Sequence, residues 1–270
     1  MSRSAAEKRA TFRELHTRGC FVIPNPWDAG SAVLLQSLGF KALASTSAGF
    51  AWTLGRPDYG LRRDDVLTHL SALVGAVDLP VNADYENAFA DAPDDVAANV
   101  AAAVATGVAG LSVEDSRRDA QEPLYDFALA IERIRAARAA IDATRSGVFL
   151  TARSEGFFVG RPDLAETIRR LRAYAEAGAD CLYAPGLREK GQIAEVVKAV
   201  APKPVNVWTQ GLPVATLAEL GVRRVSVGGA LAATAWGEVQ RAAKEIAEQG
   251  DFSAFKRAAS GVELNRLFST

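Results

Sequence analysis

A repeating unit limits what this chain can fold into. A segment with helical periodicity ends in glycine and a short apolar run follows, as in LGFKALAST (38–46), TGVAGLSVED (106–115), AGADCLYAPG (177–186) and LGVRRVSVGG (220–229). Glycine ends a helix readily because it adopts the left-handed backbone conformation. A nearly continuous apolar run is typical of a strand that is buried on both faces. The pattern therefore predicts a parallel sheet covered by helices.

Eight strands can be counted along the chain. They are expected at 20–25, 41–47, 80–86, 110–115, 147–155, 181–185, 204–209 and 224–228, with helices between them, for example at 94–106, 127–143, 163–177 and 230–249. Eight strand–helix units in residues 1–270 predict a single (β/α)8 domain, a TIM barrel. The alternative, a doubly wound open sheet, more often has a glycine-rich loop after the first strand, and VIPNPWDAG is not one. Residues 251–270 are expected to form an extra amphipathic helix that packs on a neighbour.

The composition excludes several classes of function. Lys and Arg total 31 and Asp and Glu total 32, so a net charge of −1 argues against nucleic acid or an anionic membrane as the main partner. Two cysteines, Cys20 and Cys181, build neither a disulfide framework nor a Cys-rich zinc site. No apolar run reaches the roughly 20 residues of a membrane span, and no secretory signal is visible. We expect a cytoplasmic protein that acts on a small molecule.

The two histidines offer little for catalysis. His16 and His69 both lie in amphipathic, helix-like stretches, where a packing or surface role is expected. Many hydrolases and metal sites depend on histidine as a base or ligand. The chemistry is therefore expected to depend on carboxylates, arginine and a bound ion.

Polar residues gather at the carboxyl ends of the predicted strands, where barrel enzymes place their active sites. A single acid there, such as Asp58 or Asp115, is equally well explained as a helix cap or salt-bridge partner. Pairing with an arginine is a sufficient explanation for Glu155. A set at consecutive strand ends is harder to explain structurally. That set is Asp84, Glu86, Glu114 and Arg153.

The carboxylates of this set indicate a metal site. Alternation along the third strand places Asn82, Asp84 and Glu86 on one side, and Glu114 on the adjacent strand adds a third carboxylate. Such a group raises its own pKa values unless a cation neutralises it. Mg²⁺, or else Mn²⁺, fits these oxygen ligands better than zinc does. Arg153 supplies a fixed cation beside them.

These pieces, in this order, resemble the isocitrate lyase / phosphoenolpyruvate mutase superfamily over nearly the whole chain. The resemblance is carried by Ser45-Thr46-Ser47, Gly55-x-Pro57-Asp58-x-Gly60, Asp84-x-Glu86, Val113-Glu114-Asp115, Ala152-Arg153 and Asn206. It implies a barrel whose eighth helix is swapped between the subunits of a homo-dimer or homo-tetramer. It also implies that Mg²⁺ binds near Asp84 and that backbone amides near residues 45–47 hold the carboxylate of a 2-oxo or 2-hydroxy acid.

The resemblance also implies roles for individual residues. Asp84, Glu86 and Glu114 are expected to hold the metal, directly or through its waters. Catalytic roles are expected for Arg153, Glu114 and Asp58. The residues expected to contact substrate are Trp27, Ser45, Thr46, Ser47, Arg153 and Asn206.

The chain departs from the two best-known reactions of the superfamily. SRRDAQEPLYDF follows Glu114-Asp115 and lacks the Cys and His of the lyase loop, and the longer gating loop of the phosphonomutases is absent. Arg117 and Arg118 on this short loop are expected either to close over an anionic substrate or to remain solvated.

Three functions remain open. We expect a Mg²⁺-dependent carbon–carbon lyase or decarboxylase acting on a 2-oxo or 2-hydroxy (di)carboxylic acid through a pyruvate-type enolate. An enzyme of P–C bonds, like phosphoenolpyruvate mutase or phosphonopyruvate hydrolase, and a non-catalytic barrel that binds a 2-oxo acid are the alternatives. A Schiff-base aldolase is disfavoured because Lys41 and Lys203 lie at strand starts and Lys190 lies beyond the sixth strand.

Overall fold

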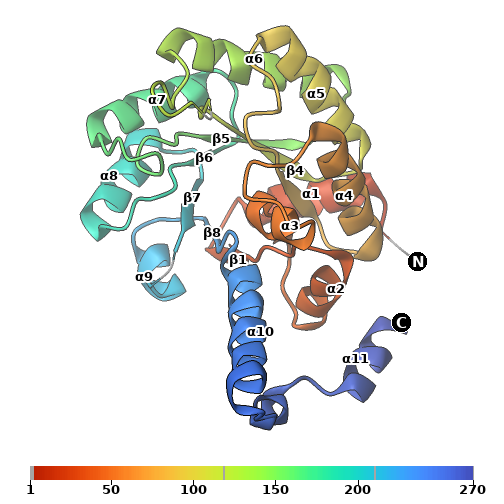
Figure 1. Ribbon diagram of the computed structural model, residues 1–270. Coiled ribbons are helices and arrows are strands. Elements are labelled where there is room, and N and C mark those ends of the chain that lie inside the picture. The colour runs from red at the N-terminus through yellow and green to blue at the C-terminus, as the bar shows by residue number, and fades with distance from the viewer. Residues whose placement is uncertain (1–2, 118, 210, 270) are drawn as a thin grey trace.

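Eight parallel strands form the expected barrel in the computed structural model, which describes residues 3–117, 119–209 and 211–269. Their order is β1-β8-β7-β6-β5-β4-β3-β2, so the first and last strands pair and the sheet curls on itself (Figure 1). Between β1 and β2, the amide of Ala44 donates to the carbonyl of Pro24 at 3.0 Å. The strands are β1 Phe21–Ile23, β2 Leu43–Ala44, β3 Val81–Asp84, β4 Gly110–Glu114, β5 Phe149–Arg153, β6 Cys181–Tyr183, β7 Val205–Trp208 and β8 Arg224–Ser226.

Helices cover the outside of the barrel, as the alternating pattern predicts. Several begin where a side chain caps the first turn: Asp126 accepts from the amide of Ala128, and Asp163 accepts from the amide of Glu166. Each strand lies inside its predicted range, and the last long helix has the predicted bounds. The helices are α1 Ala5–Leu15, α2 Ala29–Ser37, α3 Ser47–Thr53, α4 Arg63–Ala76, α5 Pro93–Ala105, α6 Phe127–Ala143, α7 Leu164–Glu176, α8 Lys190–Val200, α9 Val214–Glu219 and α10 Ala230–Gln249.

Both histidines pack in the interior. His16 follows α1 and stacks on Phe149 at the start of β5, with ring centroids 4.1 Å apart. Burial, and then the charge of Arg224, lower the pKa of His16 to about 3. His69 stacks on Phe50 at 3.8 Å, and burial lowers its pKa to about 4. The predicted packing role of the two histidines is confirmed.

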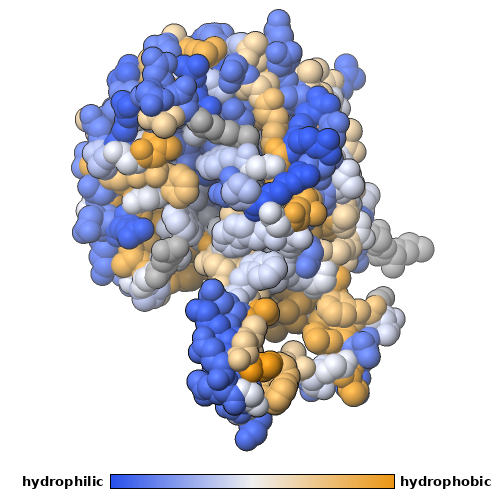
Figure 2. Space-filling model, in the orientation of Figure 1, coloured by the Kyte–Doolittle hydropathy of each residue, from blue (hydrophilic) through white to orange (hydrophobic). Residues whose placement is uncertain are grey.

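The last part of the chain leaves the barrel. Helix α10 projects from the barrel and buries only Ala232 among its residues (Figure 1). A 3₁₀ turn, η1 Ser253–Arg257, and a short helix, α11 Gly261–Phe268, follow it. Helix α11 lies against α2: a Cβ added to Gly30 of α2 would lie 3.7 Å from the aromatic ring of Phe268. Figure 2 shows apolar surface between α10 and α11.

The expectation of one helix over 251–270 is therefore wrong. Asp251 accepts from the amide of Ser253 at 2.9 Å, and Ser260 accepts from the amide of Glu263. Each of these side chains starts a new local structure, because Asp and Ser favour the position just before a helix. Thr270 lies outside the described residues. Within the part of the chain that the structure describes, none of the helices has the length and hydrophobicity to cross a membrane.

The base of the barrel leaves no room for a side chain at Gly110. A Cβ on Gly110 would lie 2.6 Å from Cε1 of Phe12 and 2.7 Å from Oδ1 of Asn82. We expect Gly110→Ala to lower the free energy of unfolding by about 1–3 kcal/mol, because overpacking forces neighbours out of place. Urea denaturation measures this. The control Gly75→Ala on α4 meets nothing within 4 Å and should be neutral or stabilising by up to about 1 kcal/mol; equal effects of the two substitutions would refute the packing argument.

Candidate active site

A cavity of about 350 Å³ opens at the carboxyl ends of the strands. All eight strands contribute to its lining, with one residue or more from each. The residues that line the cavity include Asn25, Ser45, Thr46, Ser47, Trp52, Asp58, Tyr59, Asn82, Asp84, Arg153, Phe158, Tyr183, Asn206, Trp208, Arg224 and Ser226. A mouth of this kind, with convergent polar groups, is where barrel enzymes hold their substrates.

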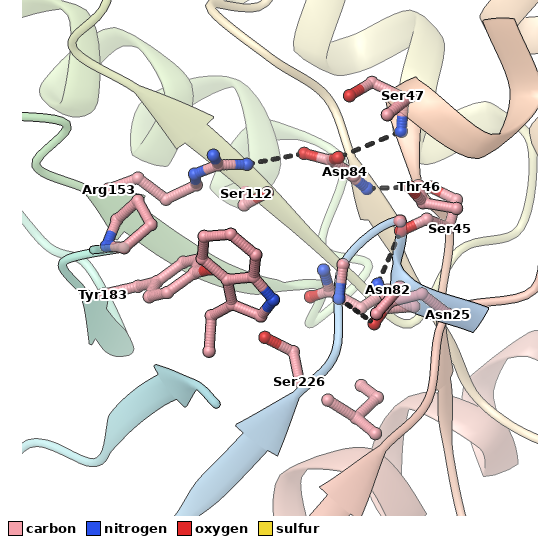
Figure 3. Close-up of a pocket in the computed structure, with 18 of the residues that line it drawn as sticks. Asn25, Ser45, Thr46, Ser47, Asn82, Asp84, Ser112, Arg153, Tyr183 and Ser226 are labelled. Atoms are coloured by element: carbon pink, nitrogen blue, oxygen red, sulfur yellow. Dashed lines mark hydrogen bonds and ion pairs between the residues drawn. The ribbon is translucent and has the colours of Figure 1, made fainter. Parts of the chain in front are cut away.

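Asp84 is held in place from three sides. Its backbone amide donates to Oγ of Ser45 at 2.8 Å, and the amide of Ser47 donates to its Oδ2 at 3.1 Å. Nη1 of Arg153 donates to the other carboxylate oxygen at 2.7 Å (Figure 3). Because Asp84 is the last residue of β3, this carboxylate is fixed at the rim of the sheet and faces the cavity.

Arg153 lies at the centre of a group of carboxylates. Besides Asp84, its guanidinium contacts Glu114 at 3.2 Å and Glu155 at 2.8 Å. Burial disfavours the charge, but Glu155, Glu114 and Asp84 outweigh it and hold the pKa of Arg153 well above its usual value. Arg153 is therefore cationic at every pH at which the protein is folded.

Three acids in and beside the cavity, Glu155, Glu114 and Asp58, have pKa values above those of free carboxyl groups. Burial raises the pKa of Glu155 to about 7, even though Arg153 opposes the shift. Burial also raises the pKa of Glu114, again against Arg153. Asp58 lines the cavity, and burial followed by the charge of Asp84 raises its pKa. An acid with a raised pKa at a cavity is suited to donate or accept a proton near neutral pH.

The cavity brings together most of the predicted site residues. Asp58, Asp84, Arg153, Asn206 and the segment 45–47 line it. The backbone amides predicted to hold a substrate carboxylate are partly used within the protein: that of Ser45 donates to the carbonyl of Asn82 and that of Ser47 to Asp84.

Glu86, Glu114 and Trp27 do not belong to this lining. Strand β3 ends at Asp84, and Glu86 has a φ of +48°, so the expected two-residue alternation does not extend to it. The side chain of Glu86 is buried. Glu114 is buried too and contacts Arg153, while Trp27 packs behind α3, beside Gly49.

The described residues of the loop after β4 do not line this cavity. Arg117 pairs with Glu122 at 2.8 Å and lines a separate hollow. Arg118 lies outside the described residues. Asp115 accepts from Tyr174 at 2.6 Å and from Arg170 at 3.1 Å, so its role is structural. Glu155, which follows β5, pairs with Arg153, as expected.

Asn25 belongs to the site but was not predicted from the sequence. Asn25 donates to the carbonyl of Ser45 at 2.9 Å and accepts from the amides of Val227 and Gly228. It thereby links the ends of β1, β2 and β8. This link bridges β1 and β2, which share no ladder of backbone hydrogen bonds. Its position between two prolines at a strand end was the available signal.

The residues of the mouth suit a hard divalent ion in part. Among the described residues, no three His, Cys, Asp or Glu side chains come together as a ready metal-binding group. Two carboxylates, Asp84 and Asp58, nevertheless line the cavity and concentrate negative charge there. The charge of Asp84 contributes to the raised pKa of Asp58. Mg²⁺ keeps several waters and needs one or two carboxylates plus substrate oxygens. Asp84 and Asp58 are the acids of the lining that could serve such an ion, whereas Glu86 lies outside the lining.

Comparisons with known proteins agree with this geometry. Residues 12–247 match the family described as phosphoenolpyruvate phosphomutase. A 2-methylisocitrate lyase from Escherichia coli is 32% identical over 179 residues, which are 64% of this chain and 60% of that protein. An oxaloacetate decarboxylase from Pseudomonas fluorescens is 30% identical over 240 residues, 85% of this chain and 81% of that one.

Solved structures share the whole architecture. A Burkholderia cenocepacia protein provisionally assigned as a lyase or mutase superposes with a TM-score of 0.96 at 49% identity, covering 98% of this chain and 97% of its own. Oxaloacetate acetylhydrolase in complex with oxalate superposes with a TM-score of 0.85 at 27% identity, over 98% of this chain and 93% of that one.

The raised pKa of Glu155 predicts a pH dependence of stability. The folded protein binds this proton up to about pH 7, whereas an ordinary glutamate releases it near 4.5. Stability should therefore fall as pH rises through this interval. The quantity to follow is the difference between the free energies of unfolding of the wild type and of Glu155→Gln. We expect this difference to fall by about 1–3 kcal/mol between pH 4.5 and 7.

Urea titrations at a series of pH values measure this difference. Glu132→Gln, at an exposed position of α6, gives the background. A difference that stays level or rises with pH would show that Glu155 is not the group that titrates.

Proposed function

The chain belongs to the phosphoenolpyruvate phosphomutase family of the isocitrate lyase / phosphoenolpyruvate mutase superfamily, and on that premise we propose that it is a Mg²⁺-dependent carbon–carbon lyase or decarboxylase. Its substrate is a 2-oxo or 2-hydroxy carboxylic acid, and the product half that remains at the site is a pyruvate-type enolate. The relatives named as lyase and decarboxylase support this reaction type.

One observation carries the proposal. The carboxylate of Asp84 and the guanidinium of Arg153 lie 2.7 Å apart in one cavity, with Asp58 in the same lining. Breaking a bond next to a carbonyl group leaves negative charge on oxygen, and a fixed cation stabilises that charge as it develops. Arg153 is already positioned by three carboxylates, so it needs no rearrangement during the reaction.

The acids of the mouth have different roles in this proposal. Asp84 would hold the ion, with Asp58 as the second acid of the same lining. When bound, Mg²⁺ supplies Lewis-acid polarisation of the substrate oxygens. Asp58 also exchanges a proton with the substrate, because burial and Asp84 raise its pKa. Glu114 contributes indirectly, because its contact with Arg153 holds the guanidinium in position.

The substrate-binding roles follow the lining of the cavity. The segment 45–47 and Asn206 contact the acid end of the substrate. Asn206 is held rigidly for this, because it donates to Oγ of Ser226 at 3.0 Å and accepts from Nε of Arg224 at 2.9 Å. Glu86 and Trp27 lie outside the lining and enter the proposal only as supporting residues.

Asp84→Asn tests the function. The substitution keeps the shape of the side chain but removes the charge that holds the ion. We expect kcat/KM to fall by about 100-fold or more, measured as pyruvate formed from a panel of 2-oxo and 2-hydroxy acids with Mg²⁺. Asp64→Asn, on the exposed start of α4, serves as the control and should keep full activity.

Two results would contradict the proposal. One is a panel from which the wild type forms no pyruvate-type product. The other is an Asp84→Asn variant with unchanged activity. Phosphorus NMR with phosphonopyruvate identifies a P–C bond reaction if that is the true one.

A homo-oligomer built through α10 is the second part of the proposal. Trp236 and Val239 of α10 are 48% and 60% exposed, and Phe252 and Phe255 after it are 59% and 57% exposed. Apolar side chains gathered on a projecting helix mark a protein interface. The implied exchange of the eighth helix between subunits would cover them.

Trp236→Asp tests this arrangement. A charge in the centre of an apolar interface should convert a dimer or tetramer into a smaller species, as measured by light scattering after size exclusion. Lys244→Asp places the same charge at an exposed polar position of α10 and should leave the mass unchanged. An unchanged mass for both variants would place the interface elsewhere.

A further inference from the structure

Arg224 is a buried cation without a carboxylate partner. Among the described residues, the buried arginines are Arg133, Arg170 and Arg224, and Arg224 is 3% exposed. Arg170 pairs with Asp115. Arg133 donates to three backbone carbonyl groups and lies over the ring of Tyr125. Within the part of the chain that the structure describes, no ion pair involves Arg224. A buried charge of this kind costs free energy unless a ligand supplies the partner.

The contacts of Arg224 are with neutral groups. Its Nε donates to Oδ1 of Asn206 at 2.9 Å, and its Nη2 donates to Oγ1 of Thr151 at 3.0 Å. Its Nη1 lies 3.4 Å from Nε2 of His16. Nδ1 of His16 lies 2.8 Å from the carbonyl of Phe12 and donates there, so Nε2 is the accepting nitrogen of the imidazole. These contacts orient the guanidinium but do not neutralise its charge.

Two N–H groups of Arg224 remain for a ligand. Nη1 and Nη2 of a guanidinium each carry two N–H donors. Each of these atoms makes one of the contacts above, so one N–H of each has no acceptor among the described residues. A pair of N–H groups on one guanidinium matches the two oxygens of a carboxylate. The free donors therefore suit a planar oxygen anion.

Arg224 belongs to the cavity and lies below the carboxylates of the mouth. It begins β8, lines the cavity, and reaches across the barrel to Thr151 of β5. Thr151 precedes Arg153 by two residues on the same side of the strand, about 7 Å nearer the base of the barrel. At the upper level, Asp84 and two other carboxylates surround Arg153. The cavity is therefore acidic at its mouth and carries an uncompensated cation at its base.

From this arrangement we propose that Arg224 binds a carboxylate group at the base of the cavity. The other groups predicted to hold an acid are engaged: the amide of Ser47 donates to Asp84, and Arg153 contacts three carboxylates. Asn206, which accepts from Arg224, places the site beside the proposed substrate contacts. The carboxylate belongs to the substrate or to a separate small acid. The first source rests on the proposed function, and the second does not.

The two histidines of the chain provide a readout of this site. His16 accepts from Arg224, whereas His69 stacks on Phe50, outside the cavity lining. Formate is titrated into protein labelled with ¹⁵N-histidine, without Mg²⁺. We expect the Nε2 resonance of His16 to move to a plateau, with a dissociation constant in the millimolar range, and the resonances of His69 to stay in place. A His16 resonance that does not move, or that moves equally with chloride, overturns the inference.

Arg224→Met removes the charge and keeps much of the length of the side chain. We expect calorimetry to show that formate binding weakens by about tenfold or more. Arg223→Met is the matched control, because the preceding Arg223 donates to the carbonyl of Gly19 at 2.7 Å and is not part of the lining. It should bind formate as the wild type does. Equal affinities of Arg224→Met and the wild type overturn the inference.

Thr151→Val separates binding from a purely structural role of Arg224. It removes one acceptor of the guanidinium and leaves the charge in place, at a residue outside the lining. We expect formate affinity to be kept or increased, and formate to raise the Tm of the wild type and of Thr151→Val. If Arg224 only connects β8 to β5, formate raises the Tm of neither protein, and the inference is overturned even where Arg224→Met does not fold.

Competition identifies the source of the carboxylate. Pyruvate and 2-oxopentanedioate share the 2-oxo acid end, and 2-oxopentanedioate adds a distal carboxylate. With Mg²⁺ present, displacement of formate by both acids assigns Arg224 to the 2-oxo acid end of the substrate. Displacement by 2-oxopentanedioate alone assigns it to a distal carboxylate, and displacement by neither assigns it to a separate small acid.

Failure of the carboxylate site and failure of the proposed function are distinguishable. Formate binding is measured without Mg²⁺ and without turnover, so it reports on Arg224 alone. If formate binds but no pyruvate-type product forms from the wider panel, the proposed function falls and the carboxylate site stands. If products form but formate does not bind, only the carboxylate site falls.

Discussion

The guanidinium of Arg153 is the interaction on which the candidate site depends. It lies within 3.2 Å of three carboxylates, which come from the ends of β3 and β4 and from the residues after β5. Buried carboxylates repel one another and take up protons, so the group persists only around a cation. Arg153 therefore connects neighbouring strand ends and sets the charge of one side of the mouth. It also fixes Asp84 where an ion and an acid substrate can reach it.

The other side of the mouth is organised by neutral contacts. Asn25 links β1, β2 and β8 through three hydrogen bonds to backbone groups, and Trp208 is anchored to Val227. The contacts of Asn25 connect β1 and β2, which share no ladder. Trp208 lines the cavity.

Much of the fold could be predicted because its signals are local. Most of the strands are short apolar runs beside a glycine or proline, and such runs report burial without knowledge of the partner strand. Asp84 and Arg153 could be found for a related reason: charge at the end of a buried strand needs an explanation. Asp58, in the loop between α3 and α4, was expected at the site from the family resemblance. Asn25 and Trp208 gave no comparable signal. Their partners near residues 227 and 228 are close only after the barrel has closed.

The sequence by itself determined the class of barrel, the superfamily and the strand ends at which the acids stand, because periodicity and motif order are properties of the chain. The tertiary structure decided which acids face the cavity. Glu86 follows Asp84 by two residues, yet the strand ends between them and the backbone of Glu86 has turned to a φ of +48°. Alternation holds only while a strand continues. Trp208 likewise meets its partner, the carbonyl of Val227, only once β7 and β8 lie side by side.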